Sequence, residues 1–244
     1  MNIKKQKIAI IGFGRFGELL AKILKPYGEI FVVSKRNIKI KGYKQIAYTD
    51  LTEMDWVIPA VPISSLEEVL KDIKPFLKKG SLLMDVCSVK VYPCRWLKKH
   101  APKDVEILGC HPMFGPDSAK NGLKGLQIVV SPLRIKEKRL KEVLTIFKKL
   151  GLNIIKATPE EHDKQGAVNL SLVHYIGRGL ADSGFKDQKI KTAGFDKLMG
   201  INENVNNDTW QLFFDIQHFN PYSKKIRQNY LKSLQKIEKK INNK

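Results

Sequence analysis

Three glycines near the start of the chain, Gly12, Gly14 and Gly17, have the spacing G-x-G-x-x-G. An apolar run over 7–11 precedes them, and apolar residues recur at helical spacing over 15–24. A strand, a tight turn and a helix in this order open a dinucleotide-binding unit, in which the glycines allow the turn, the approach of a pyrophosphate and close helix packing. This motif therefore predicts an α/β fold with a parallel sheet and a bound dinucleotide. The glycine-loop residues expected at the cofactor are Gly12, Gly14, Arg15, Phe16 and Gly17.

Buried strands alternate with helices through the first two thirds of the chain, and strand signals stop at Pro159. This alternation predicts a doubly wound parallel sheet of Rossmann type over 1–157, followed by an all-helical domain over 158–244. The expected strands after the first are 30–33, 56–61, 81–86, 105–110, 126–130 and 153–157. The expected helices after the first are 64–77, 91–98, 136–150, 159–182, 190–200, 208–219 and 221–241.

The formal charge of +20 and the three cysteines bear on which partners, metals and cellular compartment the chain is expected to have. Lysines are scattered along the whole chain, without a basic strip interleaved with aromatic residues, so we expect neither nucleic acid nor a membrane as partner. No apolar run approaches the roughly 18 residues of a membrane span. An odd number of cysteines, Cys87, Cys94 and Cys110, without metal-ligand spacing favours free thiols in a reducing cytoplasm and no metal site.

The second expected strand ends in Ser34, Lys35 and Arg36. An enzyme that uses NAD typically places an Asp or Glu here to accept hydrogen bonds from the ribose hydroxyls. A hydroxyl and two cations suit a 2′-phosphate instead, through charge-assisted hydrogen bonds. These residues favour NADP over NAD, and the alternative is that they are ordinary solvated loop charges.

Two loops after expected strands carry the most unusual residues, DVCSVK at 85–90 and GCHPMFGP at 109–116. Chemistry in an open α/β sheet collects beyond the carboxyl ends of the strands, where both loops fall. His111 is a candidate proton acceptor near neutral pH, and Ser88 can orient it or bind the substrate. Taken alone, Ser88 also suits a helix cap and His111 a structural turn residue.

The chain resembles the prephenate/arogenate dehydrogenases, most closely those of plant type, from the glycine loop to about residue 220. The segments that carry this resemblance are GFGRFG at 12–17, VPISSLEEVL at 61–70, DVCSVK at 85–90, HPMFGPDS at 111–118 and EEHDK at 160–164. The resemblance implies oxidative decarboxylation of a cyclohexadienol in tyrosine biosynthesis, with His111 and Ser88 as catalytic residues. It also implies that Val61 and Pro62 border the cofactor.

The helical half is expected to complete the pocket. Ser171, His174 and Arg178 lie three and four residues apart on one helix face. The resemblance makes His174 a substrate-binding residue, and Arg178 either offsets a substrate carboxylate or forms a structural ion pair. His162 and Asp163 belong to the matching motif, and we expect them to serve as a cap and in interdomain packing, with Asp163 orienting a neighbouring group.

Asp208 falls where plant-type arogenate enzymes carry an acid. A carboxylate there would attract the ammonium of arogenate and give the keto group of prephenate no compensation, so the resemblance favours arogenate. Asp208 also suits the N-cap of the helix that follows it. The chain ends soon after the helical half, so we expect no tyrosine-sensing domain and no fused chorismate mutase.

The Lys-rich last helix carries an apolar seam that has little to pack against in its own chain. We therefore expect a homodimer formed by the helical domain. The seam residues are Ile226, Tyr230, Leu234, Ile237 and Ile241.

Two alternative functions fit parts of the pattern. An imine, pyrroline carboxylate or β-hydroxyacid reductase that uses NADP shares the two-domain plan, but such enzymes lack the segment HPMFGP. A non-catalytic NADP sensor, or a basic nucleic-acid-binding protein that has kept the fold, would bind without turnover.

Overall fold

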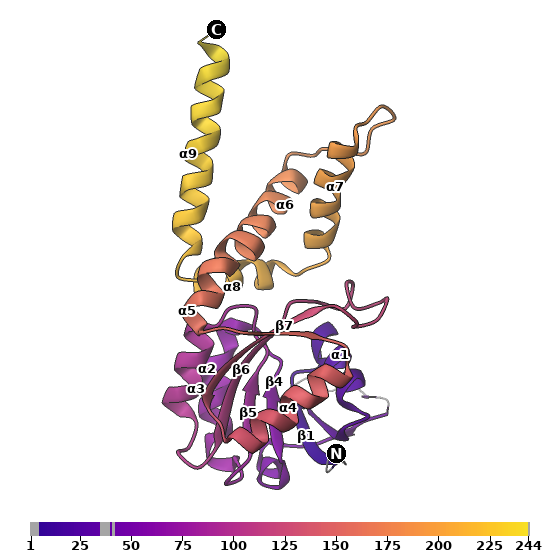
Figure 1. The fold of residues 1–244 in the computed structure, drawn as a ribbon, viewed down its shortest axis with the longest axis vertical. Coiled ribbons are helices and arrows are strands. Elements are labelled where there is room, and N and C mark those ends of the chain that lie inside the picture. Colours follow the sequence, from indigo (N-terminus) through magenta and orange to yellow (C-terminus); the bar gives the residue numbers. More distant parts are fainter. Residues whose placement is uncertain (1–4, 35–39, 41, 244) are drawn as a thin grey trace. The chain divides into compact units, whose positions relative to one another are not determined.

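The computed structural model describes residues 5–34, 40 and 42–243, and the chain divides into two compact units, Met1–Pro159 and Glu160–Lys244. The first unit is built on an eight-stranded sheet, and the second is built from helices (Figure 1). The expected Rossmann-type sheet with a helical region after it is therefore confirmed. Within the described residues, no helix is both long and apolar enough to cross a membrane.

The sheet has the strand order β3-β2-β1-β4-β5-β6-β7-β8. Its first six strands are parallel, and the order reverses between β1 and β4, which is the point where such sheets bind nucleotides. β7 runs antiparallel to β6, because the chain returns through a loop rather than a crossover helix. The strands are β1 (Gln6–Ile11), β2 (Gly28–Val33), β3 (Lys44–Gln45), β4 (Trp56–Pro59), β5 (Leu82–Asp85), β6 (Glu106–Pro112), β7 (Gln127–Arg134) and β8 (Asn153–Lys156).

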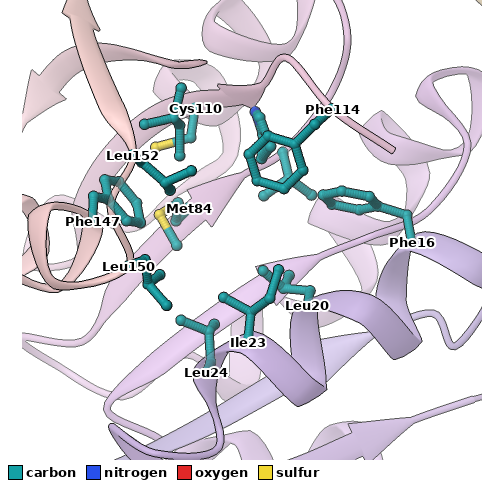
Figure 2. Close-up of a pocket in the computed structure, with 13 residues that line it drawn as sticks. Phe16, Leu20, Ile23, Leu24, Met84, Cys110, Phe114, Phe147, Leu150 and Leu152 are labelled. Atoms are coloured by element: carbon teal, nitrogen blue, oxygen red, sulfur yellow. The ribbon is translucent and has the colours of Figure 1, made fainter. Parts of the chain in front are cut away.

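Helices α1 and α4 cover one face of the sheet, and α2 and α3 cover the other (Figure 1). Between α1, α4 and the sheet lies an apolar cavity of about 20 Å³ (Figure 2). Phe16 from the glycine loop and Phe114 from the loop after β6 both line it, so the two loops share one apolar core. The helices are α1 (Arg15–Leu24), α2 (Ile63–Ile73), α3 (Val91–His100) and α4 (Glu137–Lys149), with 3-10 turns η1 (Tyr48–Glu53) and η2 (Lys74–Phe76).

The helical unit begins with one long helix in three parts, where the sequence predicts an uninterrupted helix over 159–182. The middle part, η3, is a π-helical turn. The carbonyl of Ser171 in this turn accepts a hydrogen bond from Gln217 Nε2 at 2.8 Å, which gives the turn a partner in α8. The helices are α5 (Pro159–Gly166), η3 (Ala167–Leu172), α6 (Val173–Asp182), α7 (Ala193–Asn206), α8 (Trp210–Phe219) and α9 (Ser223–Asn242).

The sequence predicts Asp208 as a suitable N-cap for the helix that follows it, but the N-cap of α8 is the next residue, Thr209. Thr209 caps α8, because its hydroxyl accepts a hydrogen bond from the Leu212 N–H at 3.1 Å. The carboxylate of Asp208 is therefore not used as the cap of this helix.

Candidate active site

The glycine loop joins the end of β1 to α1, and the space around a Cβ atom would differ at each of its three glycines. Gly12 has a φ of +95°, and a Cβ there would lie 2.5 Å from the carbonyl oxygen of Ala60. A Cβ on Gly17 would lie 2.2 Å from the Gly12 carbonyl oxygen. A Cβ on Gly14 would meet no atom of the described chain within 4 Å. The backbone at Gly14 is thus open to a ligand, while the other two glycines shape the turn.

The start of α1 fits the pyrophosphate of a dinucleotide. Gly14 is the N-cap residue, and no side chain of the described residues caps the helix there. Backbone N–H groups at a helix N-terminus bind anionic phosphate, and the helix dipole favours this. One guanidinium nitrogen of Arg15, Nη2, donates to both carboxylate oxygens of Asp117, at 2.7 and 2.8 Å, and this ion pair links the glycine loop to the loop after β6.

The carboxyl end of β2 borders an open pocket of about 480 Å³, which Ser34, Tyr48 and Asp50 help to line. This position, next to the glycine loop, suits the ribose of a dinucleotide. Lys35 and Arg36 lie outside the described residues. Val61 and Pro62 follow β4, and Pro62 is the N-cap residue of α2.

Ser88 and His111 lie on neighbouring elements at the same edge of the sheet. β5 and β6 are adjacent and parallel, and Asp85 pairs with Gly109. Ser88 follows three residues after Asp85, and His111 follows two residues after Gly109. The topology thus brings both residues to the carboxyl ends of β5 and β6, as the sequence predicts.

The surroundings of the Ser88 side chain fit a ligand-binding role more than a structural one. His111 is only 6% exposed. The Ser88 hydroxyl oxygen is buried and has no hydrogen-bond partner among the described residues. α3 begins at Val91 with Lys90 as its N-cap residue, so Ser88 does not cap this helix. A buried hydroxyl without a partner is costly, and a bound polar ligand would satisfy it.

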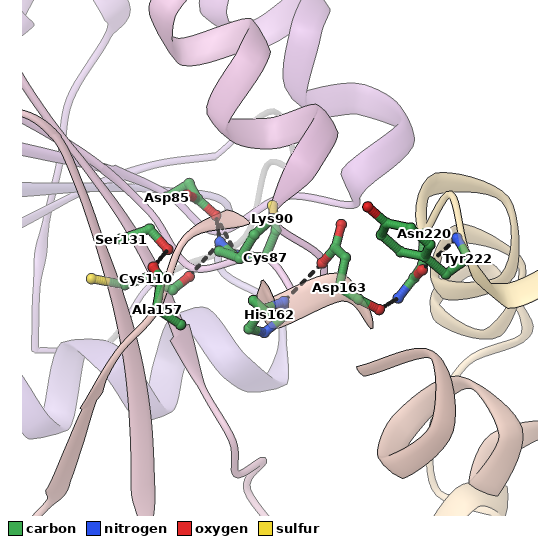
Figure 3. Close-up of polar contacts among 10 residues, drawn as sticks. All are labelled: Asp85, Cys87, Lys90, Cys110, Ser131, Ala157, His162, Asp163, Asn220 and Tyr222. Atoms are coloured by element: carbon green, nitrogen blue, oxygen red, sulfur yellow. Dashed lines mark hydrogen bonds and ion pairs between the residues drawn. The ribbon is translucent and has the colours of Figure 1, made fainter. Parts of the chain in front are cut away.

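A buried ion pair joins Asp85 to Lys90, which flank Ser88 in the sequence (Figure 3). Lys90 Nζ contacts the carboxylate of Asp85 and donates a hydrogen bond to the carbonyl oxygen of Cys110 at 2.5 Å. Burial disfavours the charged lysine, but the attraction of Asp85 outweighs it, and the pKa of Lys90 is raised. Burial also raises the pKa of the Cys87 and Cys110 thiols, and the charge of Asp85 adds to this, so both stay protonated.

His174 and Arg178 of α6 both lie near Asp208 in the helical unit. His174 Nε2 lies 3.8 Å from Asp208 Oδ2, which is too long for a hydrogen bond. Burial and the charge of Arg178 lower the pKa of His174 to about 4, so its ring is neutral at pH 7. Its Nδ1 atom is buried without a hydrogen-bond partner in the described part of the chain. The Arg178 guanidinium bonds the Asp208 carbonyl oxygen and lies 4.4 Å from the centre of the Trp210 ring.

His162 and Asp163 form a buried contact in α5. His162 Nδ1 and Asp163 Oδ1 are 2.7 Å apart, and the Asp163 carbonyl accepts a hydrogen bond from Asn220 Nδ2 at 2.8 Å (Figure 3). These bonds tie α5 to the link between α8 and α9 within the helical unit, and the expected interdomain role of this pair stays a prediction.

The sequence pattern assigned no role to Asp85, Lys90 or Asp117. All three lie within the segments DVCSVK and HPMFGPDS, so their place in these motifs was the one feature of the sequence that could have pointed to them. Their pairing depends on contacts across 5 and 102 residues of sequence, which spacing alone does not reveal.

Comparison with known proteins decides the family. Residues 32–156 match the model described as "Prephenate dehydrogenase, nucleotide-binding domain". The chain belongs to the prephenate dehydrogenase family. Residues 180–244 match a second model, "TYRAAT1-like, C-terminal domain". The family assignment rules out the imine, pyrroline carboxylate and β-hydroxyacid reductases as the chain's family.

Relatives in this family include two proteins of Arabidopsis thaliana. Arogenate dehydrogenase 2, chloroplastic, is 32% identical over 95% of the chain, and arogenate dehydrogenase 1, chloroplastic, is 31% identical over 88%. The chain spans 67% of the first relative's length and 36% of the second's. The prephenate dehydrogenase of A. aeolicus, solved with hydroxyphenyl propionate and NAD+, has the same fold, with a TM-score of 0.79, 20% identity and coverage of 100% and 93% of the two chains.

Proposed function

We propose that the chain catalyses the NADP-dependent oxidative decarboxylation of arogenate or prephenate in tyrosine biosynthesis, with arogenate favoured. One observation carries this proposal: the candidate acid-base residue His111 and the buried hydroxyl of Ser88 lie at the carboxyl ends of adjacent strands in a nucleotide-binding sheet. Membership in the prephenate dehydrogenase family supports the same reaction.

The residues that would hold the cofactor are those of the glycine loop, with Ser34, Lys35, Arg36, Val61 and Pro62 around it. The open backbone at Gly14 and the uncapped start of α1 fit a pyrophosphate. NADP, when bound, would supply the hydride acceptor for C4 of the substrate ring.

The protein's own task is to align the ring and to remove one proton. His111 accepts the proton of the C4 hydroxyl as that oxygen becomes a carbonyl, and Ser88 hydrogen-bonds the same oxygen or the His111 ring. The C1–carboxylate bond breaks, its electron pair enters the ring, and carbon dioxide leaves. The electron pair moves through the ring to the C4 oxygen, which takes the proton back from His111. The product is a phenol, and its aromaticity supplies the driving force.

The helical unit would contribute the substrate-binding residues His174, Arg178 and Asp208. His174 is neutral, and its buried Nδ1 has no partner among the described residues, which suits a hydrogen bond to a polar substrate group. Asp208 is one third exposed, so its carboxylate is accessible to the ammonium of arogenate. Arg178 already bonds the Asp208 carbonyl, and we propose that it offsets substrate carboxylate charge from there.

The preference for NADP rests on the end of β2. Ser34 lines the open pocket, and Lys35 and Arg36 follow it in sequence without an acid at this position. Two cations and a hydroxyl favour a 2′-phosphate.

A homodimer through the helical unit is also proposed. Leu234, Ile237 and Ile241 of α9 are 44%, 54% and 64% exposed, so the apolar seam lies open on this helix. A second copy of the chain would cover it.

The test follows the formation of NADPH or NADH at 340 nm with the purified protein, supplying arogenate or prephenate, each with NADP or NAD. Chromatography identifies tyrosine or 4-hydroxyphenylpyruvate as the product. We expect the fastest turnover with arogenate and NADP, and loss of turnover in His111→Ala. Turnover of prephenate alone would overturn the role of Asp208, and silence with both substrates would overturn the proposed activity.

A further inference from the structure

The buried pair of Asp85 and Lys90 is unusual because both side chains are fully buried, at 0% exposure each. Burying two charges costs several kcal/mol per ion, and an apolar pair of the same volume is often as stable or more so. Stability alone therefore gives little reason for an ion pair at this place. The contacts around the pair suggest what it does.

Asp85 closes the loop that carries Ser88. Its Oδ1 atom accepts a hydrogen bond from the Cys87 N–H at 2.9 Å and also contacts Lys90 Nζ. Ser88 lies between these two attachment points, and Val89 beside it is fully buried. The backbone on both sides of Ser88 is thus held by one carboxylate.

Lys90 extends this hold to the neighbouring strand. Its backbone carbonyl accepts the first hydrogen bond of α3, from the Cys94 N–H at 2.9 Å, while its side chain reaches β6 and bonds the Cys110 carbonyl. That carbonyl belongs to the planar peptide group that joins Cys110 to His111. Fixing its direction fixes the plane from which the His111 side chain departs.

We infer that Asp85 and Lys90 are positioning residues, which set the Ser88 loop and the His111 peptide in one fixed relation through a shared buried ion pair. This inference rests on the proposed function for the roles of Ser88 and His111. A misplacement of about 1 Å of a reacting group can cost about 100-fold in rate. The pair would thus act on turnover and leave the distant cofactor phosphates unaffected.

The decisive variant is the double substitution Asp85→Asn with Lys90→Met. It removes both charges together, and the amide oxygen introduced in place of the carboxylate would still accept from the Cys87 N–H, so no buried charge is left alone to prevent folding. The single variant Lys90→Met leaves Asp85 buried without its lysine and is expected to fold poorly. The matched control is Ser131→Ala, which loses the partly buried hydrogen bond from Ser131 Oγ in β7 to the Ala157 carbonyl (2.8 Å).

We expect the double variant to keep its melting temperature within a few degrees and its NADP dissociation constant unchanged. Its kcat should fall by about 100-fold, while KM changes by less than about 3-fold. Ser131→Ala should lose stability and keep kcat. A folded double variant with kcat within about 3-fold of the natural chain would overturn the inference.

A second readout does not depend on turnover. The imidazole ¹H–¹³C signals of His111, assigned with His111→Asn, should shift or broaden in the double variant and stay in place in Ser131→Ala. If the natural chain turns over neither substrate, the proposed function fails while this readout still tests the positioning. Unchanged His111 signals in the double variant would contradict the inference directly.

Discussion

The α/β unit and the helical unit hold their candidate site residues in different ways. In the α/β unit, Ser88 lies in the loop after β5 and His111 lies at the end of β6, and the parallel pairing of the two strands brings both residues to one edge of the sheet. In the helical unit, His174 and Asp208 come from α6 and from the link before α8, and no common edge collects them. The sheet topology determines where Ser88 and His111 lie. The positions of His174 and Asp208 depend instead on the rotation of α6 about its axis and on where α8 begins.

The largest effect on activity should come from a substitution of His111 at the edge of the sheet. His111→Asn keeps the size of the side chain and removes the proton acceptor, so we expect kcat to fall by about 1000-fold with NADP affinity unchanged. Steady-state rates and a fluorescence titration with NADP measure the two quantities. The control His100→Asn, on α3 and paired with Glu67, should retain full activity. A His111 variant that keeps a tenth of the natural rate would exclude it as the base.

The helical unit should respond most to pH. His174 has a pKa of about 4 in the folded chain against 6.5 in the unfolded chain, so below pH 6.5 the unfolded state takes up a proton that the folded state does not. The free energy of unfolding therefore does not depend on this ring above pH 6.5, and it falls by about 3 kcal/mol as the pH falls from 6.5 to 4.

The NMR titration of the His174 ring checks this prediction, with His174→Gln to assign the signal. Urea unfolding at pH 7 and pH 4 should show a smaller loss of stability in His174→Gln than in the natural chain. A titration midpoint near pH 6.5 in the folded chain would contradict the prediction, because it would show that the His174 ring is not desolvated.

Substitutions of two glycines should separate folding from binding within the α/β unit. Gly12→Ala forces a side chain into positive φ and against the Ala60 carbonyl, and should lower the free energy of unfolding by about 2 kcal/mol or more. Gly14→Ala meets open space, so it should leave stability within about 0.5 kcal/mol. Its methyl group would instead weaken NADP binding by about 10-fold. Thermal melts and NADP titrations of both variants test this, and equal destabilisation by the two would contradict it.

The smallest effect concerns the choice of substrate. Asp208→Asn removes the carboxylate but keeps the Thr209 cap and the backbone carbonyl that Arg178 bonds. The ratio of kcat/KM for arogenate over prephenate should fall by about 5-fold. Asp182→Asn removes an exposed carboxylate from the same unit and should leave the ratio unchanged. An unchanged ratio in Asp208→Asn would remove this residue from substrate selection.

Much of the α/β unit could be predicted because local patterns determine it. The glycine spacing, the apolar strands and the position of Ser88 and His111 near the strand ends are all visible within short windows of sequence, although β6 runs on to Pro112 and so includes His111. The antiparallel direction of β7 was not visible, since a buried strand has the same pattern in either direction. The Asp85–Lys90 pair was not visible either, because a lysine in sequence gives no sign that it is buried.

The helical unit was less predictable for a physical reason. The periodicity of 3.6 residues indicates helices but not a π turn, and residues 167–172 have no composition that distinguishes them from an α-helix. The expected N-cap at Asp208 was wrong because Thr209 offers an equally suitable oxygen one residue later. Roles for His174, Arg178 and Asp208 came from resemblance rather than from pattern.

The π-helical turn also bears on how the length of this helix can change. Such a turn closes with i→i+5 hydrogen bonds and so accommodates one residue more than an α turn. Deleting one residue within Ala167–Leu172 would restore a regular helix and leave His174 and Arg178 at the same rotational angle relative to α5. The same deletion inside α6 would rotate everything after it by about 100°. A relative one residue shorter in this turn would therefore present the same side chains, and a gap in an alignment there would mark no difference in three dimensions.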